Sequence, residues 1–428
     1  MSAAKIIMQR IGMLAKISDE PGTITRTFAS SAMRSANELV AGWMHQAGMK
    51  TRADAIGNLI GHYDGIKPDA KILLLGSHLD TVRNAGKFDG PLGVLLAIAC
   101  VNDLRRRKVR LSFAIEVIGF ADEEGVRYQT AYLGSEVLAG RFDTKDLQRK
   151  DANGISMADA IKRVGGNLAK LKSARLNSRI LLGYVEAHIE QGPVLEKSNL
   201  AVGIVNTIAG QTRARVSFIG RAGHAGTTPM NLRKDALCAA AEFITATEKL
   251  AKKTSGLVAT VGEISASPGA GNVIPGEVRL SLDIRHAKDS IRRAAHSALK
   301  KTAFQISRRR KIKLDGEVVH ETAAVNCSDK LSKLLGQSVK SRQKKLVRLL
   351  SGAGHDAAVM AKITPAAMLF IRCKNGVSHH PDESVKIQDM QIALDILNHF
   401  LQSLGEKYEP HAGKRMVKRS INLVKRAL

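Results

Sequence analysis

One buried strand of this chain ends among metal-binding residue types, and this stretch constrains the fold more than any other. The apolar run KILLL at 71–75 is typical of a buried strand. It leads directly into GSHLDTVRNAGKFDGPLG at 76–93, where His78, Asp80 and Asp89 stand among glycines. His78 and Asp80 are two residues apart, so on an extended strand their side chains point to the same side. One of them can then bind a metal ion while the other orients that ligand.

Strand-like and helix-like segments alternate through the first half of the chain. Helices are expected at 93–107 and 130–140, and strands at 111–122 and 182–192. Continuous apolar strands separated by helices predict an α/β domain, with a mostly parallel sheet flanked by helices. Ligands of such sheets bind beyond the carboxyl ends of the strands. Several metal-binding or acid–base residues stand at or just past those ends: His78, Glu123, Glu124 and His188.

From about residue 209 the pattern changes to that of a second domain. Strands and two long helices are expected there, at 214–223, 234–253, 256–266, 277–286, 289–307 and 311–320. This order predicts an α+β sandwich at 209–320, inserted as a lid or dimerisation domain. The first pattern then resumes with a helix at 328–340, a strand at 367–372 and a helix at 387–403. The expected division is a catalytic domain in two parts, 1–208 and 321–408, and a basic tail at 409–428.

The charge of the chain is strongly positive. Lysine and arginine outnumber the acids by 66 to 39, a net charge of +27, which first suggests nucleic-acid binding. However, the basic residues stand in short clusters, and aromatic residues make up only 4%, so few side chains could stack on bases. A solvated basic surface on a protein with another function is favoured. Only the tail at 409–428 leaves the nucleic-acid hypothesis open.

Targeting signals and paired cysteines are absent from the sequence. No stretch approaches the 18 apolar residues of a membrane span, and the first residues lack the pattern of a signal peptide. The four cysteines form no CxxC pair and are widely separated: Cys100, Cys238, Cys327 and Cys373. These features predict a cytoplasmic protein without a disulfide framework, a cysteine–zinc site or a membrane partner.

Histidines and acids recur in glycine-rich loops along the chain. Beside the stretch at 76–93, they stand in ADEEG at 121–125, EAHIEQG at 186–192 and GVSHHPDE at 376–383. Each motif alone is weak, because an isolated histidine or acidic pair usually lies in a solvated turn. Together they offer five or six nitrogen and oxygen ligands, which suit two zinc or manganese ions that share one ligand. The residues alone therefore indicate a two-metal hydrolase.

A longer series of motifs resembles a known family. The chain contains these motifs in order: GSHLDTV, GKFDGPLGVL, FADEEG, EAHIEQGPVLE, GHAGTTPM, NVIPGEV, LDIRH, SGAGHDA and GVSHHPDE. The resemblance runs from about residue 10 to about residue 405. The motifs resemble the di-zinc amidohydrolases of the aminoacylase/carboxypeptidase superfamily. Within it, the match is to the branch of allantoate amidohydrolase and N-carbamoyl-L-amino-acid hydrolase.

The resemblance implies a set of metal ligands and a general base. One ion would be held by His78, Asp89 and His188, with Asp89 as the bridging carboxylate. Glu124 and His379 would complete the second ion, and His379 is chosen over His380 because the ligand histidine follows the serine of the last motif. Two further residues would act beside the ions: Glu123 as the general base that deprotonates water, and Asp80 as the carboxylate that orients His78.

The resemblance also assigns residues to the substrate. His224 would reach into the site of a partner subunit to stabilise the oxyanion, which implies a homodimer with shared active sites. Gln191, Arg213, Asn272 and Arg285 match substrate-binding positions. Arg285 suits the substrate carboxylate, because a guanidinium binds carboxylates bidentately.

The implied reaction is hydrolysis of a ureido C–N bond in a small carboxylate, with release of ammonia and carbon dioxide. The motif NAGKFDGPLG resembles the allantoate branch more closely, which slightly favours allantoate over N-carbamoyl amino acids. Two alternatives stay open: a metallo-aminoacylase or dipeptidase of the same superfamily, and a basic nucleic-acid-binding protein on a hydrolase fold.

Overall fold

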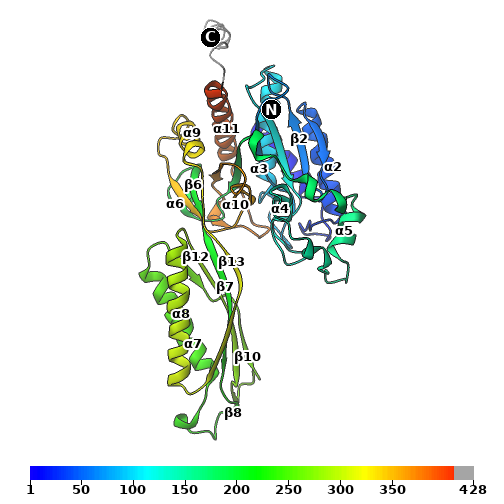
Figure 1. The fold of residues 1–428 in the computed structure, drawn as a ribbon. Coiled ribbons are helices and arrows are strands. Elements are labelled where there is room, and N and C mark those ends of the chain that lie inside the picture. The colour runs from blue at the N-terminus through cyan, green and yellow to red at the C-terminus, as the bar shows by residue number, and fades with distance from the viewer. Residues whose placement is uncertain (409–428) are drawn as a thin grey trace. The chain divides into compact units, whose positions relative to one another are not determined.

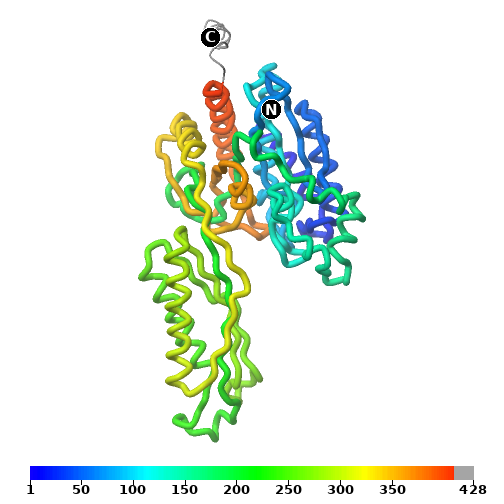
Figure 2. Tube along the Cα trace, in the orientation of Figure 1, coloured from blue at the N-terminus to red at the C-terminus, as the bar shows by residue number. Residues whose placement is uncertain are grey.

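The computed structural model describes residues 1–408 and divides into two compact units. The first contains Met1–Asn206, Cys327–Leu349 and the chain from His355 onward, and the second contains Thr207–Asn326 with Leu350–Gly354. The chain thus leaves the first unit and returns to it, as the trace in Figure 2 shows. These limits lie close to those expected at 209 and 320, although the short segment 350–354 was not expected in the second unit. The basic tail at 409–428 lies outside the described residues.

The first unit is built on a mixed sheet with the strand order β1-β2-β4-β3-β5-β16-β6. Two of these strands, β2 and β6, are labelled in Figure 1. The central strands β4, β3, β5 and β16 are parallel, whereas β1, β2 and β6 pair antiparallel at the edges. Two more strands of the same sheet, β14 and β15, pair with β6, although the residues of β14 fall within the limits of the second unit. The strands are β1 (Lys50–Ala53), β2 (Leu59–Tyr63), β3 (Ile72–His78), β4 (Ala114–Phe120), β5 (Leu181–Ile189), β6 (Val202–Ile208), β14 (Val325–Asn326), β15 (Arg348–Ser351) and β16 (Ala366–Ile371).

Helices cover this sheet, and its central strands are therefore buried almost along their whole length. One continuous apolar core joins the strands to α1, α2, α3, α9 and α11, and a smaller cluster holds α4 and α5. The helices are α1 (Ala3–Leu14), α2 (Ser31–Gln46), α3 (Pro91–Arg106), α4 (Leu133–Leu138), α5 (Met157–Arg163), α6 (Val194–Lys197), α9 (Asp329–Lys340), α10 (Asp356–Met360) and α11 (Ile387–Tyr408). Helix α3 begins with Pro91, whose fixed φ suits a first helical position, directly after the loop that carries Asp89.

The second unit is an antiparallel sheet packed on one face by two helices. The strand order is β10-β12-β7-β13, with β9 also paired to β12, and a separate ribbon joins β8 to β11. Burial alternates along β7 and β12, so one face of the sheet forms the core with α7 and α8. The elements are β7 (Gly210–Ile219), β8 (Gly223–His224), α7 (Ala236–Lys253), β9 (Val258–Thr260), β10 (Ile264–Ser267), β11 (Val273–Ile274), β12 (Glu277–His286), α8 (Asp289–Arg309) and β13 (Lys313–Thr322).

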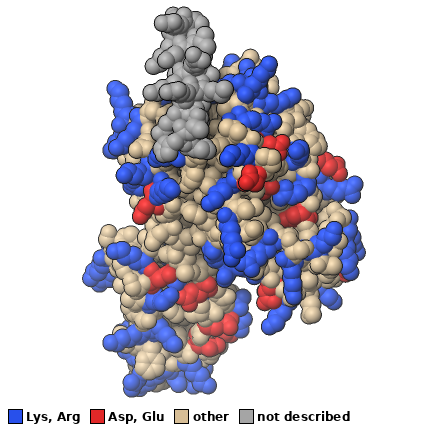
Figure 3. Space-filling view, turned by 45° about the horizontal axis from the view of Figure 1, so that its top comes forward, with Lys and Arg blue, Asp and Glu red and all other residues tan. Residues whose placement is uncertain are grey.

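The predicted α/β class with an inserted α+β domain is confirmed. Two details differ: the sheet of the first unit has antiparallel edges, and the strand expected at 256–266 is divided into β9 and β10. Among the described residues, no helix is both long enough and apolar enough to cross a membrane. Lysine and arginine are spread over the visible face of both units and mixed with acids, rather than gathered in one patch (Figure 3).

Candidate metal centre and active site

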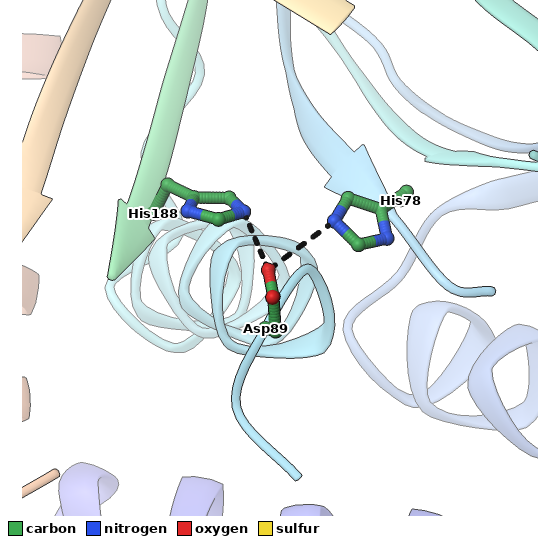
Figure 4. Close-up of side chains that lie close together, drawn as sticks. All are labelled: His78, Asp89 and His188. Carbon is green, nitrogen blue, oxygen red and sulfur yellow. Dashed lines mark ion pairs between the residues drawn. The ribbon is translucent and has the colours of Figure 1, made fainter. Parts of the chain in front are cut away.

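Three buried side chains converge at the carboxyl ends of neighbouring strands. His78 ends β3, His188 lies near the end of β5, and Asp89 stands in the loop before α3. Asp89 Oδ1 lies 3.5 Å from His78 Nε2 and 3.0 Å from His188 Nε2 (Figure 4). One ligand atom from each residue lies within 4.8 Å of the others, so the three could hold one cation.

The hydrogen bonds of the two imidazoles indicate that a cation belongs between them. His78 Nδ1 lies 3.0 Å from the carbonyl of Asp80, and His188 Nδ1 lies 2.9 Å from that of Ile189. A carbonyl can only accept, so each Nδ1 carries the proton and each Nε2 of a neutral ring presents a lone pair to Asp89. Asp89 Oδ1 is buried and accepts no hydrogen bond in the described structure. When both rings are neutral, two nitrogen lone pairs and a carboxylate oxygen face one another, and such a set of ligand atoms fits a metal ion.

The other oxygen of Asp89 faces a second group of ligands. His379 Nε2 lies 3.2 Å from Asp89 Oδ2 and 3.4 Å from Glu124 Oε1. Ligand atoms of Asp89, Glu124 and His379 all lie within 4.8 Å of one another. The backbone of His379 has a φ of +56°, a strained conformation for a non-glycine residue that is often found at functional sites. His380 instead pairs with Asp382 at 3.5 Å, so the structure brings His379 and not His380 to the cluster.

Asp80 connects His78 to the two glutamates that follow β4. Its Oδ1 accepts a hydrogen bond from the Glu123 amide at 3.0 Å, and its Oδ2 accepts one from the Glu124 amide at 3.1 Å. Oδ1 also lies 3.4 Å from His78 Nδ1. Asp80 thus lies beside His78, the residue that it was expected to orient. It also holds the amides of both glutamates, a role that the sequence did not indicate.

Burial and like charges favour the protonated forms of these glutamates. Burial, followed by the negative charge of Glu124, raises the pKa of Glu123 well above its ordinary value. Burial, followed by the negative charge of Asp89, raises the pKa of Glu124 to about 7. A ligand atom of Glu123 lies within 4.8 Å of ligand atoms of His78 and Glu124, which belong to the two groups of ligands. A carboxylate with a raised pKa beside a bound water is suited to proton transfer near neutral pH.

Three polar residues hold Asp89 in place, and two of them were not found from the sequence. Gln191, expected to bind substrate, donates from Nε2 to Asp89 Oδ2 at 3.0 Å, while its buried Oε1 accepts no hydrogen bond in the described structure. Ser378 Oγ lies 2.8 Å from Asp89 Oδ2. Glu383 Oε1 accepts hydrogen bonds from the amides of Phe88 and Asp89 at 2.7 and 3.0 Å. Ser378 and Glu383 stand in the motif GVSHHPDE together with His379. This proximity in the sequence was the only feature that could have pointed to them.

The second unit brings together the two arginines that were expected to bind substrate. Arg285 donates from Nε and Nη2 to the two oxygens of Asp283, at 2.9 Å each, and Arg213 Nε lies 3.2 Å from the same carboxylate. Burial raises the pKa of Asp283, but the hydrogen bond and charge of Arg285 together with the hydrogen bonds from Gln211 and Arg213 outweigh burial, so the net shift is downward. Asp283, which the sequence did not single out, thus orients both guanidinium groups.

The other two expected substrate residues lie together at the opposite end of this unit. His224 is on β8, and the amide of its neighbour Ala225 donates to the carbonyl of Asn272 at 2.9 Å. His224 and Asn272 are both exposed. Strand β8, which carries His224, lies beyond the end of β7 (Figure 1). Arg213 is near the start of β7, and Ile219 is its last residue. The rise of an extended strand places Arg213 and Ile219 about 20 Å apart, before the further distance to His224 is counted.

Comparison with known proteins places this arrangement in a family. Residues 74–403 match the peptidase family M20/M25/M40. Allantoate deiminase 1 of Glycine max is 40% identical over 92% of this chain and 88% of its own length. The N-carbamoyl-L-amino acid amidohydrolase of Geobacillus stearothermophilus is 39% identical over 94% of this chain and 98% of its own. A crystal structure of a hydantoinase/carbamoylase family amidase from Burkholderia multivorans matches with a TM-score of 0.89 and 29% identity, over 95% and 98% of the two chains. The chain belongs to the peptidase family M20/M25/M40.

Proposed function

We propose that this protein is a dinuclear-metal amidohydrolase that cleaves a ureido C–N bond of a small carboxylate and releases ammonia and carbon dioxide. The observation that carries the proposal is the position of Asp89, whose two carboxylate oxygens face two separate ligand groups. A carboxylate in this position can bridge two ions. The relatives named for allantoate and for N-carbamoyl amino acids, at 40% and 39% identity, support a ureido substrate.

We assign the first ion to His78, Asp89 and His188, and the second to Asp89, Glu124 and His379. Zinc or manganese suits these nitrogen and oxygen ligands, and either would polarise the substrate carbonyl and lower the pKa of a bound water. Glu123 takes the proton of the attacking water and returns it to the departing nitrogen. Asp80 fixes the backbone from which Glu123 acts, through the hydrogen bond at 3.0 Å.

For the substrate, we assign Arg285 and Arg213 to the carboxylate, Gln191 to a polar group, and His224 with Asn272 to the oxyanion. The distance within the second unit supports shared active sites. A small ureido carboxylate cannot reach from Arg213 to His224, which are more than about 20 Å apart along the sheet. A site that uses both ends of this unit needs two copies of the chain, which supports a homodimer.

The first experiment is a substrate panel with the purified protein supplied with Mn²⁺ or Zn²⁺. Ammonia release is measured from allantoate, N-carbamoyl amino acids and ureidoglycolate, and amine release from acyl amino acids. We expect turnover of a ureido compound, with allantoate as the first candidate. Cleavage of acyl amino acids alone would instead support the metallo-aminoacylase alternative.

Replacement of the general base tests the mechanism. Glu123→Gln should lower kcat by about 10²- to 10⁴-fold while the protein still binds two ions, because the carboxylate is a proton acceptor and not an assigned ligand. Glu116→Gln is the matched control, because Glu116 is a buried glutamate of β4 that pairs with Arg52 at 3.0 Å. Substantial turnover by Glu123→Gln would contradict the assignment.

Mixing inactive variants tests the shared site. His224→Ala should also lose turnover without losing metal. When it is mixed with Glu123→Gln under conditions that exchange subunits, part of the activity should return, because each mixed dimer has one site with both residues intact. Mixed dimers that form but stay inactive would contradict sharing.

We also propose a cytoplasmic location, because all four cysteines are free in the structure and three of them are buried. The nucleic-acid-binding alternative has a direct test in salt-dependent binding to DNA or RNA, lost on removal of residues 411–428.

A further inference from the structure

We infer that Glu383 is a positioning residue that keeps the shared carboxylate of Asp89 between the two ligand groups. This inference rests on the proposed dinuclear function. Glu383 contacts no assigned substrate group and supplies no assigned metal ligand, so its effect on the reaction passes through Asp89.

The contacts of Glu383 reach Asp89 by two routes. Its Oε1 accepts hydrogen bonds from the amides of Phe88 and Asp89 at 2.7 and 3.0 Å, which fixes the backbone of the ligand. Its Oε2 lies 3.1 Å from Ser378 Oγ, which itself lies 2.8 Å from Asp89 Oδ2. Glu383 thus supports both the main chain and, through Ser378, the side chain of the bridging residue.

Glu383 also connects two loops that are distant in the sequence. Phe88 and Glu383 are separated by 295 residues. One loop carries Asp89 and the other carries Ser378 and His379, so the ligands assigned to the second ion depend on the distance between these loops. Since a bridging ligand serves both ions, a shift of Asp89 would weaken both sites together.

The loop that carries Asp89 is shaped around this carboxylate. A Cβ atom at Gly86 would lie 2.4 Å from Glu383 Cβ and Cδ, and 2.5 Å from its Oε1. Real Cβ atoms do not approach so closely, so only glycine lets the backbone pass Glu383 at this distance. The glycine at position 86 is thereby explained by a packing contact rather than by a turn.

A matched glutamate separates a role in the metal centre from a general role in stability. Glu190 also accepts two successive backbone amides, those of Val194 and Leu195, at 2.8 and 2.9 Å. That segment carries no assigned ligand. Removal of either carboxylate leaves two amides without their acceptor, but only Glu383 should affect metal binding.

The experiment compares Glu383→Ala, Glu383→Gln and Glu190→Ala with the unchanged chain by calorimetric titration with Mn²⁺. Glu383→Ala should lower the affinity for both ions by about 10- to 100-fold, the usual cost of removing a partner of a metal ligand. Glu383→Gln should recover most of the affinity, since its amide oxygen can still accept from both backbone amides. Glu190→Ala should bind Mn²⁺ within about twofold of the unchanged chain, because no assigned ligand depends on the amides it holds. At saturating Mn²⁺, Glu383→Ala should regain most of its kcat.

A second variant keeps the inference testable if Glu383→Ala does not fold. Gly86→Ala substitutes neither a ligand nor Glu383, but it forces the loop that carries Asp89 away from the Glu383 carboxylate, so it should also weaken Mn²⁺ binding. Normal Mn²⁺ affinity in a folded Glu383→Ala, or in Gly86→Ala, would overturn the inference. If the unchanged chain bound no divalent ion, the inference and the proposed function would fall together. Two bound ions without turnover of any ureido substrate would overturn the proposed function alone.

Discussion

Substitution of Gly90 by alanine tests how closely the chain is packed around the first metal ligand. Gly90 precedes α3 with φ +80° and ψ −65°, a backbone conformation that residues other than glycine rarely adopt. A Cβ atom there would lie 2.5 Å from Nδ1 and Cε1 of the His78 ring and 2.6 Å from the His78 carbonyl oxygen. The imidazole would have to move, and its Nε2 would then leave its place opposite Asp89.

The expected cost has two parts. The backbone conformation costs about 1–3 kcal/mol for a non-glycine residue, and the overpacking against His78 costs about 1–3 kcal/mol more. Gly154 separates the two parts, because it has φ +76° and no atom within 4 Å of an added Cβ. Gly154→Ala should therefore show only the backbone cost.

Two measurements check this reasoning: urea unfolding of the metal-free protein, and calorimetric titration with Mn²⁺. Gly90→Ala should be less stable than Gly154→Ala by about 1–3 kcal/mol if the ring stays in place. If the ring moves instead, the same free energy should appear as a loss of Mn²⁺ affinity, about tenfold for each 1.4 kcal/mol. Equal stability and equal Mn²⁺ affinity for the two variants would refute the packing argument.

Three further predictions concern the metals, the core and the charge. Removal of divalent ions with EDTA should lower the free energy of unfolding by about 2.7 kcal/mol for each ion, relative to protein in Mn²⁺ at 100 times the dissociation constant, and Mn²⁺ should restore it; thermal unfolding with and without the ion checks this. Asp389→Ala should cost about 3–5 kcal/mol in urea unfolding without changing Mn²⁺ binding, because Asp389 is buried and binds Arg372 bidentately at 2.7 and 2.8 Å. The KM for an anionic ureido substrate should rise with ionic strength in steady-state assays, because the net charge is +27; a KM independent of salt would argue against electrostatic attraction of the substrate.

The parts of the fold that follow from local patterns were predictable from the sequence. The strand expected at 277–286 is β12, with the same limits, and the helix expected at 289–307 is α8, which continues to Arg309. Both have strong periodicity that local sequence can reveal. The antiparallel edges of the first sheet were not foreseen, because the direction of an edge strand depends on the connection before it rather than on its own residues.

The candidate site was predictable where residues of the right chemistry stand at strand ends. His78 and His188 follow this rule, because the parallel strands β3 and β5 are neighbours and their carboxyl ends meet. Glu383 and Asp283 do not, since Glu383 holds the amides of Phe88 and Asp89, and Asp283 joins its neighbour Arg285 to Arg213, which lies 70 residues away. An acidic residue in a loop or on a partly exposed strand is usually solvated. Their roles depend on contacts that no local pattern encodes.

The adjacent histidines 379 and 380 show what kind of information was missing. Their chemistry is identical, and residue type alone cannot separate them; His379 was preferred only because the motif resembles that of a known family. In the structure, the left-handed backbone of His379 turns its ring toward Asp89 and Glu124, while His380 faces Asp382. That conformation costs about 1–2 kcal/mol for a residue with a Cβ atom, so the surrounding contacts must maintain it. Ser378, anchored to Glu383 and Asp89 immediately before His379, provides such contacts. The choice between the two histidines is therefore made by the residues that hold the loop, and a variant that releases Ser378 from Glu383 should loosen His379 together with Asp89.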